Sequence, residues 1–181
     1  MRTERQKKGG NSIKPRKIPN LWEFNCFGCS STNKYGLQLQ FYLSGDNECF
    51  TECKISDQYC GFNGFVHGGI ITTLLDEVAA WTIISQLFKI AITHEITTRY
   101  LNPVPTNTII RVAAEIVSFN EKVVDVRSKI TSENGLLLAE ADSKWLIPSI
   151  STLAKVAGFP EKYLAQLFDK VIQPIKQLYA D

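Results

Sequence analysis

The sequence predicts an α+β fold in which one long helix lies against an antiparallel sheet. A segment from Gly61 to Phe88 opens with glycines and then continues for about twenty residues without Pro or Gly. Two strand-like segments precede this helix and four follow it. The chain has neither the alternating strands and helices of a Rossmann protein nor a glycine-rich nucleotide-binding motif, so those classes are excluded.

Length and composition favour a single domain. The chain has 181 residues, of which 44% are hydrophobic and 21% charged, as in ordinary soluble proteins. We expect a flexible basic tail over 1–18, a folded domain over 19–148 and a helical extension over 149–181. The tail carries seven Lys or Arg and one Glu. Solvated disorder is the commoner state of such a tail, so we expect no nucleic-acid partner.

No secretory signal or membrane span is apparent in the sequence, because the basic N-terminus lacks an apolar core and the most hydrophobic stretch soon meets Asp76 and Glu77. The five cysteines are an odd number without the spacing of a disulfide framework. We therefore expect a cytoplasmic protein with no membrane partner.

The sequence Cys26-Phe27-Gly28-Cys29 fits a zinc site, a redox pair or a compact turn with small buried thiols. A closed zinc site needs four ligands. Neither a second CxxC nor a HxxxH motif follows, and the other cysteines are poorly spaced for this task. The sequence thus favours the compact turn and predicts no metal.

Alternating apolar residues predict a half-buried strand over 36–44, followed by a hairpin turn at 45–47 and a second strand over 48–55. The face that should be buried consists of Leu37, Leu39, Phe41 and Leu43. Residues 57–66 should form the loop that leads into the long helix.

The long helix is predicted to be buried, because apolar side chains occupy almost every direction around it. Asp76 is the costliest polar residue in it, since it sits among Leu74, Leu75 and Val78. A carboxylate retained in such surroundings usually has a partner or a function.

Four strands should follow, over 92–101, 108–119, 122–132 and 136–147. After Pro148, we expect a connector over 149–158 and a helix over 160–179 that Pro174 kinks or ends. An apolar stripe on this helix favours packing on its own chain over binding a partner.

The helix start at His67-Gly68-Gly69 suits a carbonyl or an oxyanion, because the first turn offers unpaired N–H groups and the positive end of the helix dipole. Gly68 and Asp76 are eight residues apart, which is about 12 Å along one helix. One reacting carbonyl cannot meet both groups within a single chain. If they share a substrate, they must come from two chains.

Three segments carry a resemblance to a known family: CFGCSSTNKYGLQLQF, HGGIITTLLDE and THEITTRYLNPVP. In this order and spacing they resemble the PaaI-like (phenylacetate-pathway type) branch of the hot-dog-fold acyl-CoA thioesterases, over roughly residues 22–148. The resemblance implies a long central helix wrapped by a curved antiparallel sheet of about six strands. It also implies that two subunits pair their sheets, giving a homodimer or a dimer of dimers.

The resemblance also implies roles for individual residues. Asp76 would act as general base or as nucleophile. The backbone N–H of Gly68 would polarise the thioester carbonyl, and Gly69 would allow close approach. His67 would orient the loop, and Thr93 would position the attacking water or the substrate. No metal or cofactor is required, since coenzyme A is part of the substrate.

Two further residues are candidate substrate contacts. Many family members carry a Gln or Asn shortly before the aromatic-glycine turn, but this chain has Tyr59-Cys60, which leaves Asn63 as the nearest amide. Thr72 lies one turn before Asp76 on the same helix face and is also an alternative partner for its carboxylate.

The expected function is hydrolysis of a medium-chain, long-chain or aromatic acyl-CoA between two subunits. Arg99 and Arg127 are candidate contacts for the phosphates of CoA, although solvated strand faces explain them equally well. The alternative is a non-catalytic hot-dog module that binds acyl-CoA or serves as a scaffold.

Overall fold

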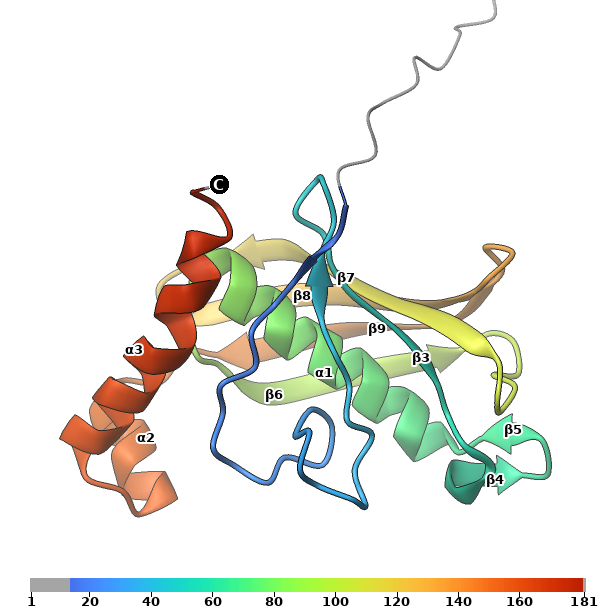
Figure 1. Ribbon diagram of the computed structural model, residues 1–181, viewed down its shortest axis with the longest axis horizontal. Helices are drawn as coiled ribbons and strands as arrows, with labels where there is room; N and C mark the ends of the chain where they lie inside the picture. Colours follow the sequence, from blue (N-terminus) through green and yellow to red (C-terminus); the bar gives the residue numbers. More distant parts are fainter. Residues whose placement is uncertain (1–13, 181) are drawn as a thin grey trace, which may run out of the picture.

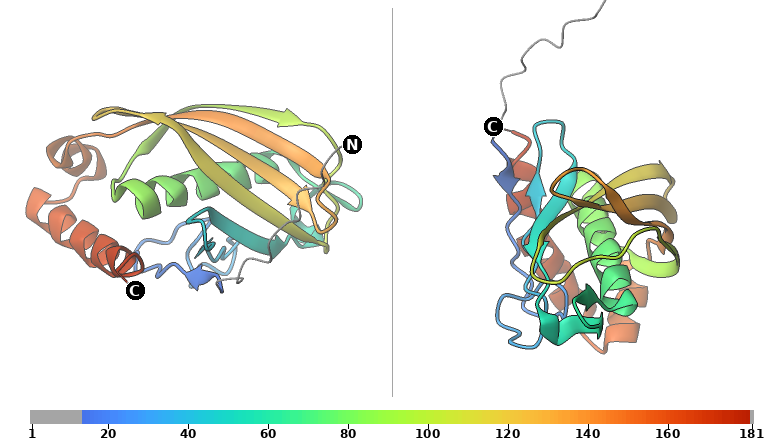
Figure 2. Two further views of the ribbon diagram at one scale, coloured as in Figure 1. Left: turned by 90° about the horizontal axis from the view of Figure 1, so that it is seen from above. Right: turned by 90° about the vertical axis from the view of Figure 1, so that its right-hand side faces the viewer.

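A computed structural model describes residues 14–180 (Figure 1). A single helix, α1 (Gly68–Leu87), lies in the hollow of a curved seven-stranded sheet. Seen from above, the strands that follow α1 in the sequence cover one side of the helix, while the N-terminal segment and the last helix lie on the other side (Figure 2). The arrangement is the α+β hot-dog fold that the sequence predicted, with one strand more than expected.

The sheet is antiparallel, with the strand order β1-β2-β3-β7-β8-β9-β6. Its strands are β1 (Arg16–Lys17), β2 (Tyr42–Leu43), β3 (Cys49–Lys54), β6 (Ile92–Tyr100), β7 (Ile109–Phe119), β8 (Val123–Ser132) and β9 (Leu137–Leu146). The last four strands and β3 lie within one residue of their predicted limits. Strand β6 pairs only with β9, so its other edge is free in the described chain.

The predicted strand over 36–44 forms only at its end. Gln38 has a positive φ of 51°, which interrupts the extended backbone. The N–H groups of Leu37 and Leu39 donate to the carbonyls of Phe27 and Gly28, at 2.8 and 2.9 Å, instead of to a neighbouring strand. The predicted burial is nevertheless confirmed for three of the four residues, namely Leu39, Phe41 and Leu43.

The predicted loop over 57–66 contains short elements. A 3-10 turn, η1 (Asp57–Tyr59), precedes a small hairpin of β4 (Cys60–Phe62) and β5 (Phe65–Val66). Gly64 has a φ of 81° in the turn of this hairpin, a conformation that glycine adopts readily. The N–H of His67 donates to the carbonyl of Tyr59 at 2.9 Å. The 3-10 turn thereby holds the residue that precedes α1.

Helix α1 is the centre of the core. Leu74, Leu75 and Val78 have no exposed surface, and Trp81 stacks on Phe41 with ring centroids 5.3 Å apart. By length and composition α1 is also apolar enough to cross a membrane. This is weak evidence for a membrane span, because buried core helices have the same length and composition. Here α1 packs against β3, β6, β7, β8 and β9.

The C-terminal extension consists of α2 (Ile150–Ala157) and α3 (Glu161–Gln177). The prediction of a connector over 149–158 is therefore wrong for most of that segment. Ser149 caps α2 through its side chain, and Gly158 ends the helix with a left-handed backbone. Helix α3 continues past Pro174 for about one turn.

The extension packs on its own chain, as predicted. Val171 and Ile175 are fully buried in the main core. Trp22 and Phe168 meet edge to face, with ring centroids 5.8 Å apart. Figure 1 shows α2 and α3 beside the end of α1 that is distant from the β4–β5 hairpin.

The N-terminal boundary lies earlier than expected. Residues 1–13 of the predicted tail lie outside the described residues. Arg16 and Lys17 already form β1, the side chain of Arg16 donates to the carbonyl of Leu178, and Ile18 is buried. The folded part of the chain thus includes residues that the sequence assigned to the tail.

Candidate functional site

Asp76 and Thr93 form a pair between the middle of α1 and the start of β6. The Thr93 hydroxyl donates to Asp76 Oδ1 at 2.8 Å. Burial raises the pKa of Asp76, and the hydrogen bond from Thr93 opposes part of that rise. Asp76 Oδ2 has no hydrogen-bond partner among residues 14–180, and none of their ion pairs involves Asp76. The structure thus holds a half-buried carboxylate by one oxygen and leaves the other free.

A β-bulge in β6 gives Thr93 its orientation. The register between β6 and β9 shifts between Thr93 and Glu95, so His94 is the extra residue. Side chains of a regular strand alternate between its two faces, which would place Thr93 and Thr98 on opposite faces. Both nevertheless contact polar groups of α1. Because of the bulge, Thr93 and Thr98 both lie on the face of β6 that is turned towards α1.

A second group of polar side chains lies at the start of α1. His67 is the N-cap of the helix, and its Nδ1 accepts from the N–H of Gly69 at 2.9 Å. The hydroxyl of Tyr100 donates to the carbonyl of Gly68 at 3.2 Å. His67 thus contacts the backbone of the first helical turn, and Tyr100, which the sequence analysis did not single out, belongs to the same group.

The N–H of Gly68 is free for a ligand. No hydrogen bond of the described chain takes it up, as expected for the first residue of a helix. The atoms nearest to a Cβ at this position would be those of the ring and hydroxyl of Tyr100, at 3.5 to 3.6 Å, which is ordinary van der Waals contact. A cleft of about 400 Å³ borders Gly68, Tyr100 and Asn102. The helix start is therefore open to an incoming carbonyl.

Thr72 belongs to the group at the helix start. Its hydroxyl lies 2.9 Å from the hydroxyl of Tyr100 and 3.2 Å from that of Thr98. Thr93, and not Thr72, is the residue hydrogen-bonded to Asp76. Asn63 lies exposed in the turn of the β4–β5 hairpin, and no hydrogen bond joins its side chain to either group within residues 14–180.

One chain keeps the two groups apart. Gly68 and Asp76 lie on the same helix, so their separation along its axis is about 12 Å, as the sequence predicted. The structure unites Asp76 with Thr93, and Gly68 with His67, Gly69 and Thr72, but it does not unite the two sets. A single chain therefore holds two separate groups of candidate site residues.

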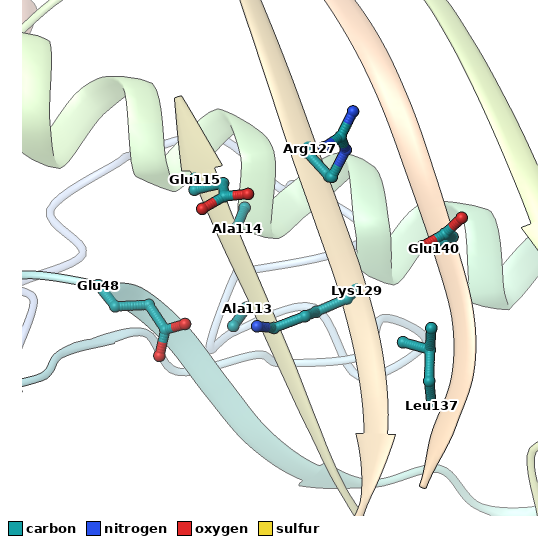
Figure 3. Close-up of a pocket in the computed structure, with 8 residues that line it drawn as sticks. All are labelled: Glu48, Ala113, Ala114, Glu115, Arg127, Lys129, Leu137 and Glu140. Atoms are coloured by element: carbon teal, nitrogen blue, oxygen red, sulfur yellow. The ribbon is translucent and has the colours of Figure 1, made fainter. Parts of the chain in front are cut away.

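The arginines on the outer face of the sheet already have anionic partners. Arg99 pairs with Glu140 at 2.7 Å and with Asp142 at 2.6 Å, and Arg127 pairs with Asp142 at 2.9 Å. A small pocket of about 100 Å³ nearby is shown in Figure 3. Its charged side chains are Glu48, Glu115, Glu140, Arg127 and Lys129, so carboxylates outnumber cations. This face is a poor match for the phosphates of CoA.

Comparisons with known proteins agree with the fold. The thioesterase superfamily model matches residues 63–139, the segment that contains every predicted site residue. A comparison with curated protein sequences gives no match. Hot-dog proteins of the thioesterase superfamily are thus what this chain resembles, while the PaaI-like subtype stays a prediction.

Three solved structures illustrate the similarity. The thioesterase superfamily protein RHA08564 is 20% identical over 64% of this chain, with a TM-score of 0.59, and the match spans 56% of that protein. Zebrafish thioesterase superfamily member 2 is 19% identical over 61% of this chain and 81% of its own, with a TM-score of 0.56. The BH2602 protein from Bacillus halodurans, solved with CoA, is 24% identical over 62% of this chain and 75% of its own, with a TM-score of 0.57.

Proposed function

We propose that the protein hydrolyses acyl-CoA thioesters at a site formed by two copies of the chain. The observation that carries the proposal is the half-buried carboxylate of Asp76, which Thr93 holds by Oδ1 while Oδ2 remains free. A carboxylate with a raised pKa and one free oxygen is suited to accept a proton from water. The match to the thioesterase superfamily over 63–139 supports the same chemistry.

The edge of β6 that has no neighbouring strand among residues 14–180 supports the two-chain site. An unpaired edge strand of nine residues is a natural place for a second copy to add its own β6. A two-fold axis at this edge would make the two copies of α1 antiparallel. Gly68 of one chain would then lie near Asp76 of the partner, and each dimer would have two sites.

The reaction follows from these positions. The N–H of Gly68 binds the carbonyl oxygen of the thioester and stabilises the negative charge that develops on it. Asp76 Oδ2 accepts a proton from water as the water oxygen attacks the carbonyl carbon. The carbon–sulfur bond then breaks, the proton passes to the departing thiolate, and a free acid and the thiol of CoA leave. Thr93 keeps the carboxylate in place throughout.

The substrate class rests on the resemblance and on the structural neighbours. The Bacillus halodurans protein and a hypothetical thioesterase from Streptococcus pneumoniae were solved with CoA. We propose that this chain likewise takes a CoA ester, with a medium-chain, long-chain or aromatic acyl group, and that it works as a homodimer or a dimer of dimers.

Release of free thiol from a panel of short, long and aromatic acyl-CoAs tests the proposal. We expect Asp76→Asn to lower kcat/KM by about 10²- to 10⁴-fold, because it removes the base. Asp169→Asn, which changes an exposed carboxylate on α3, is the matched control and should retain the rate. Equal rates for the natural protein and Asp76→Asn would remove Asp76 from the mechanism.

A second candidate function is a hot-dog module that binds acyl-CoA without turnover. The position of Asn63 favours it, because this amide is exposed in a hairpin turn and is not hydrogen-bonded beside Gly68. Acyl-CoA binding by the natural protein, with no thiol released from any ester of the panel, would support this module against the enzyme.

A further inference from the structure

Three side chains with metal-binding atoms converge outside the proposed catalytic site. The Sγ atoms of Cys26 and Cys29 lie 3.3 Å apart, and Cys26 Sγ lies 3.4 Å from Glu77 Oε1. The three ligand atoms all lie within 4.8 Å of one another, and no other such group of His, Cys, Asp and Glu occurs in residues 14–180. The sequence analysis had only the two cysteines, because Glu77 comes from α1, far along the chain.

The turn between the cysteines is shaped to admit Glu77. A Cβ on Gly28 would lie 2.3 Å from Cδ and 2.5 Å from Oε1 of Glu77, distances at which atoms overlap. A side chain at this position would displace the Glu77 carboxylate from its place beside the two thiols. The N–H of Cys29 also donates to Cys26 Sγ, at 3.4 Å, a contact that stabilises a thiolate.

The cluster has two thiols and a carboxylate, and no basic side chain of the described residues is paired with it. Glu77 is partly buried, and none of the ion pairs within residues 14–180 involves it. A bound divalent cation would supply the positive charge that this carboxylate lacks among the described residues, and its thiol ligands bind as thiolates.

We propose that Cys26, Cys29 and Glu77 bind a zinc ion through two thiolates and one carboxylate. Zinc takes sulfur and oxygen ligands at about 2.0 to 2.3 Å, so a tetrahedral centre separates its ligand atoms by about 3.5 to 3.8 Å. The observed separations of 3.3 and 3.4 Å require only small movements of the side chains. Two soft thiolates favour zinc over magnesium or calcium.

The fourth position of the zinc ion remains for a water molecule. All three ligand residues line an apolar cavity of about 320 Å³ between α1, the N-terminal segment and the C-terminal extension. Its other lining residues include Trp22, Trp81, Leu164 and Phe168, and no further metal-binding side chain is among them. The fourth ligand is therefore not supplied by the residues around this cavity.

A metal here joins two parts of the chain beside the catalytic candidate. Cys26 and Cys29 belong to the N-terminal segment, whereas Glu77 is the residue next to Asp76 on α1. The zinc ion would fix the segment against the helix at that point. We assign it a positioning role and no part in the proton transfer.

Zinc content and cobalt spectroscopy test the site on the full chain. After reduction and dialysis against Zn²⁺, followed by removal of loose ions, we expect about one zinc per chain. Cobalt in place of zinc should show a thiolate-to-metal charge-transfer band and the intense visible bands of tetrahedral cobalt. Cys26→Ser, Cys29→Ser and Glu77→Gln should each weaken zinc binding by at least about tenfold. Gly28→Ala should do the same, because it displaces Glu77.

The matched controls change the same residue types elsewhere. Cys60→Ser alters an exposed cysteine and Glu95→Gln an exposed carboxylate, so both should retain one zinc per chain. Absence of zinc from the reduced natural protein would overturn the proposal. Full zinc content in the folded Cys26→Ser and Glu77→Gln variants would overturn it as well.

A second measurement keeps the test decisive if a ligand variant does not fold. In the Cys60→Ser protein, zinc should slow the alkylation of Cys26 and Cys29, and a chelator should restore the fast rate. An alkylation rate that is independent of zinc would reject the site. None of these readouts uses hydrolysis, so the zinc site and the proposed thioesterase activity can fail independently.

Discussion

The hydroxyl of Thr93 lies 2.8 Å from the carboxylate of Asp76 and joins the edge strand β6 to the middle of α1. The strand that contacts the candidate base is also the strand whose outer edge has no partner among residues 14–180. Contact with a second chain at β6 would act directly on the position of Thr93. A dimer formed at β6 would thus link assembly to the geometry of the candidate site through one strand.

Loss of the Thr93 hydroxyl should lower the rate without unfolding the protein. We expect Thr93→Val to reduce kcat by about 10- to 100-fold, because the carboxylate loses the contact that orients it. Thr93→Ser keeps a hydroxyl at the same place and should recover most of the rate. Steady-state hydrolysis with circular dichroism as a check on folding measures both. A Val variant as active as the Ser variant would contradict the positioning role.

Mixed dimers should show whether the site needs two chains. Gly68→Val and Asp76→Asn each remove one half of the site. A heterodimer of the two variants would contain one intact site, with Gly68 from one subunit and Asp76 from the other. After unfolding and refolding at equal amounts, about one quarter of the natural activity should return.

Each variant refolded alone is the control for this experiment and should stay inactive. Light scattering should confirm that the mixture is dimeric. A mixture as inactive as the separate variants would place both groups of a working site in one chain.

Deletion of His94 should remove the bulge and turn Thr93 away from the helix. Because side chains of a strand alternate in direction, loss of one residue exchanges the face of all residues on one side of the deletion. We expect the deletion to lower kcat at least as much as Thr93→Val. His94→Ala keeps the number of residues, and its side chain is exposed, so this control should retain the rate.

The C-terminal extension should contribute measurably to stability. Ile175 is fully buried in the main core, whereas Ile172, one turn earlier on α3, is only partly buried. Ile175→Ala should lower the free energy of unfolding by about 2 to 5 kcal/mol. Ile172→Ala should cost less. Denaturant unfolding compares the two, and equal losses would show that α3 does not pack as described.

Thiol reagents should distinguish the cysteines that lie outside the proposed zinc site. Burial raises the pKa of Cys49 and of Cys53 to about 12, so at pH 8 only about 10⁻⁴ of either thiol is in the reactive thiolate form. Cys60 is exposed and should react first. Mass spectrometry after brief labelling should find Cys49 and Cys53 modified only in denaturant. Fast labelling of Cys49 in the folded protein would contradict its burial.

The long helix and the later strands could be predicted because their patterns are strong over many residues. Strands β7, β8 and β9 are separated by short polar turns, and α1 lacks Pro and Gly after its first turn. Local signals were weaker elsewhere. Residues 36–41 alternate like a strand, yet a positive φ at Gln38 and hydrogen bonds to the cysteine turn keep them out of the sheet.

The site could be predicted only in part. The nine-residue spacing from His67 to Asp76 pointed to the helix, and Thr93 was a candidate from the resemblance. The contact between Thr93 and Asp76 depends on a bulge that the alternation of the strand does not reveal. The approach of Glu77 to Cys26 depends on how the N-terminal segment folds back on α1, which no local pattern encodes.

The bulge at His94 also has a consequence for protein engineering. A designer could copy Asp76, Thr93 and Thr98 onto another helix-and-strand scaffold without the inserted residue His94. The two threonines would then lie on opposite sides of the strand. The inserted residue must be copied with them, since it brings Thr93 and Thr98 onto the same face of the strand. His94 therefore belongs to the smallest set of residues that would have to be transferred, although its own side chain is exposed.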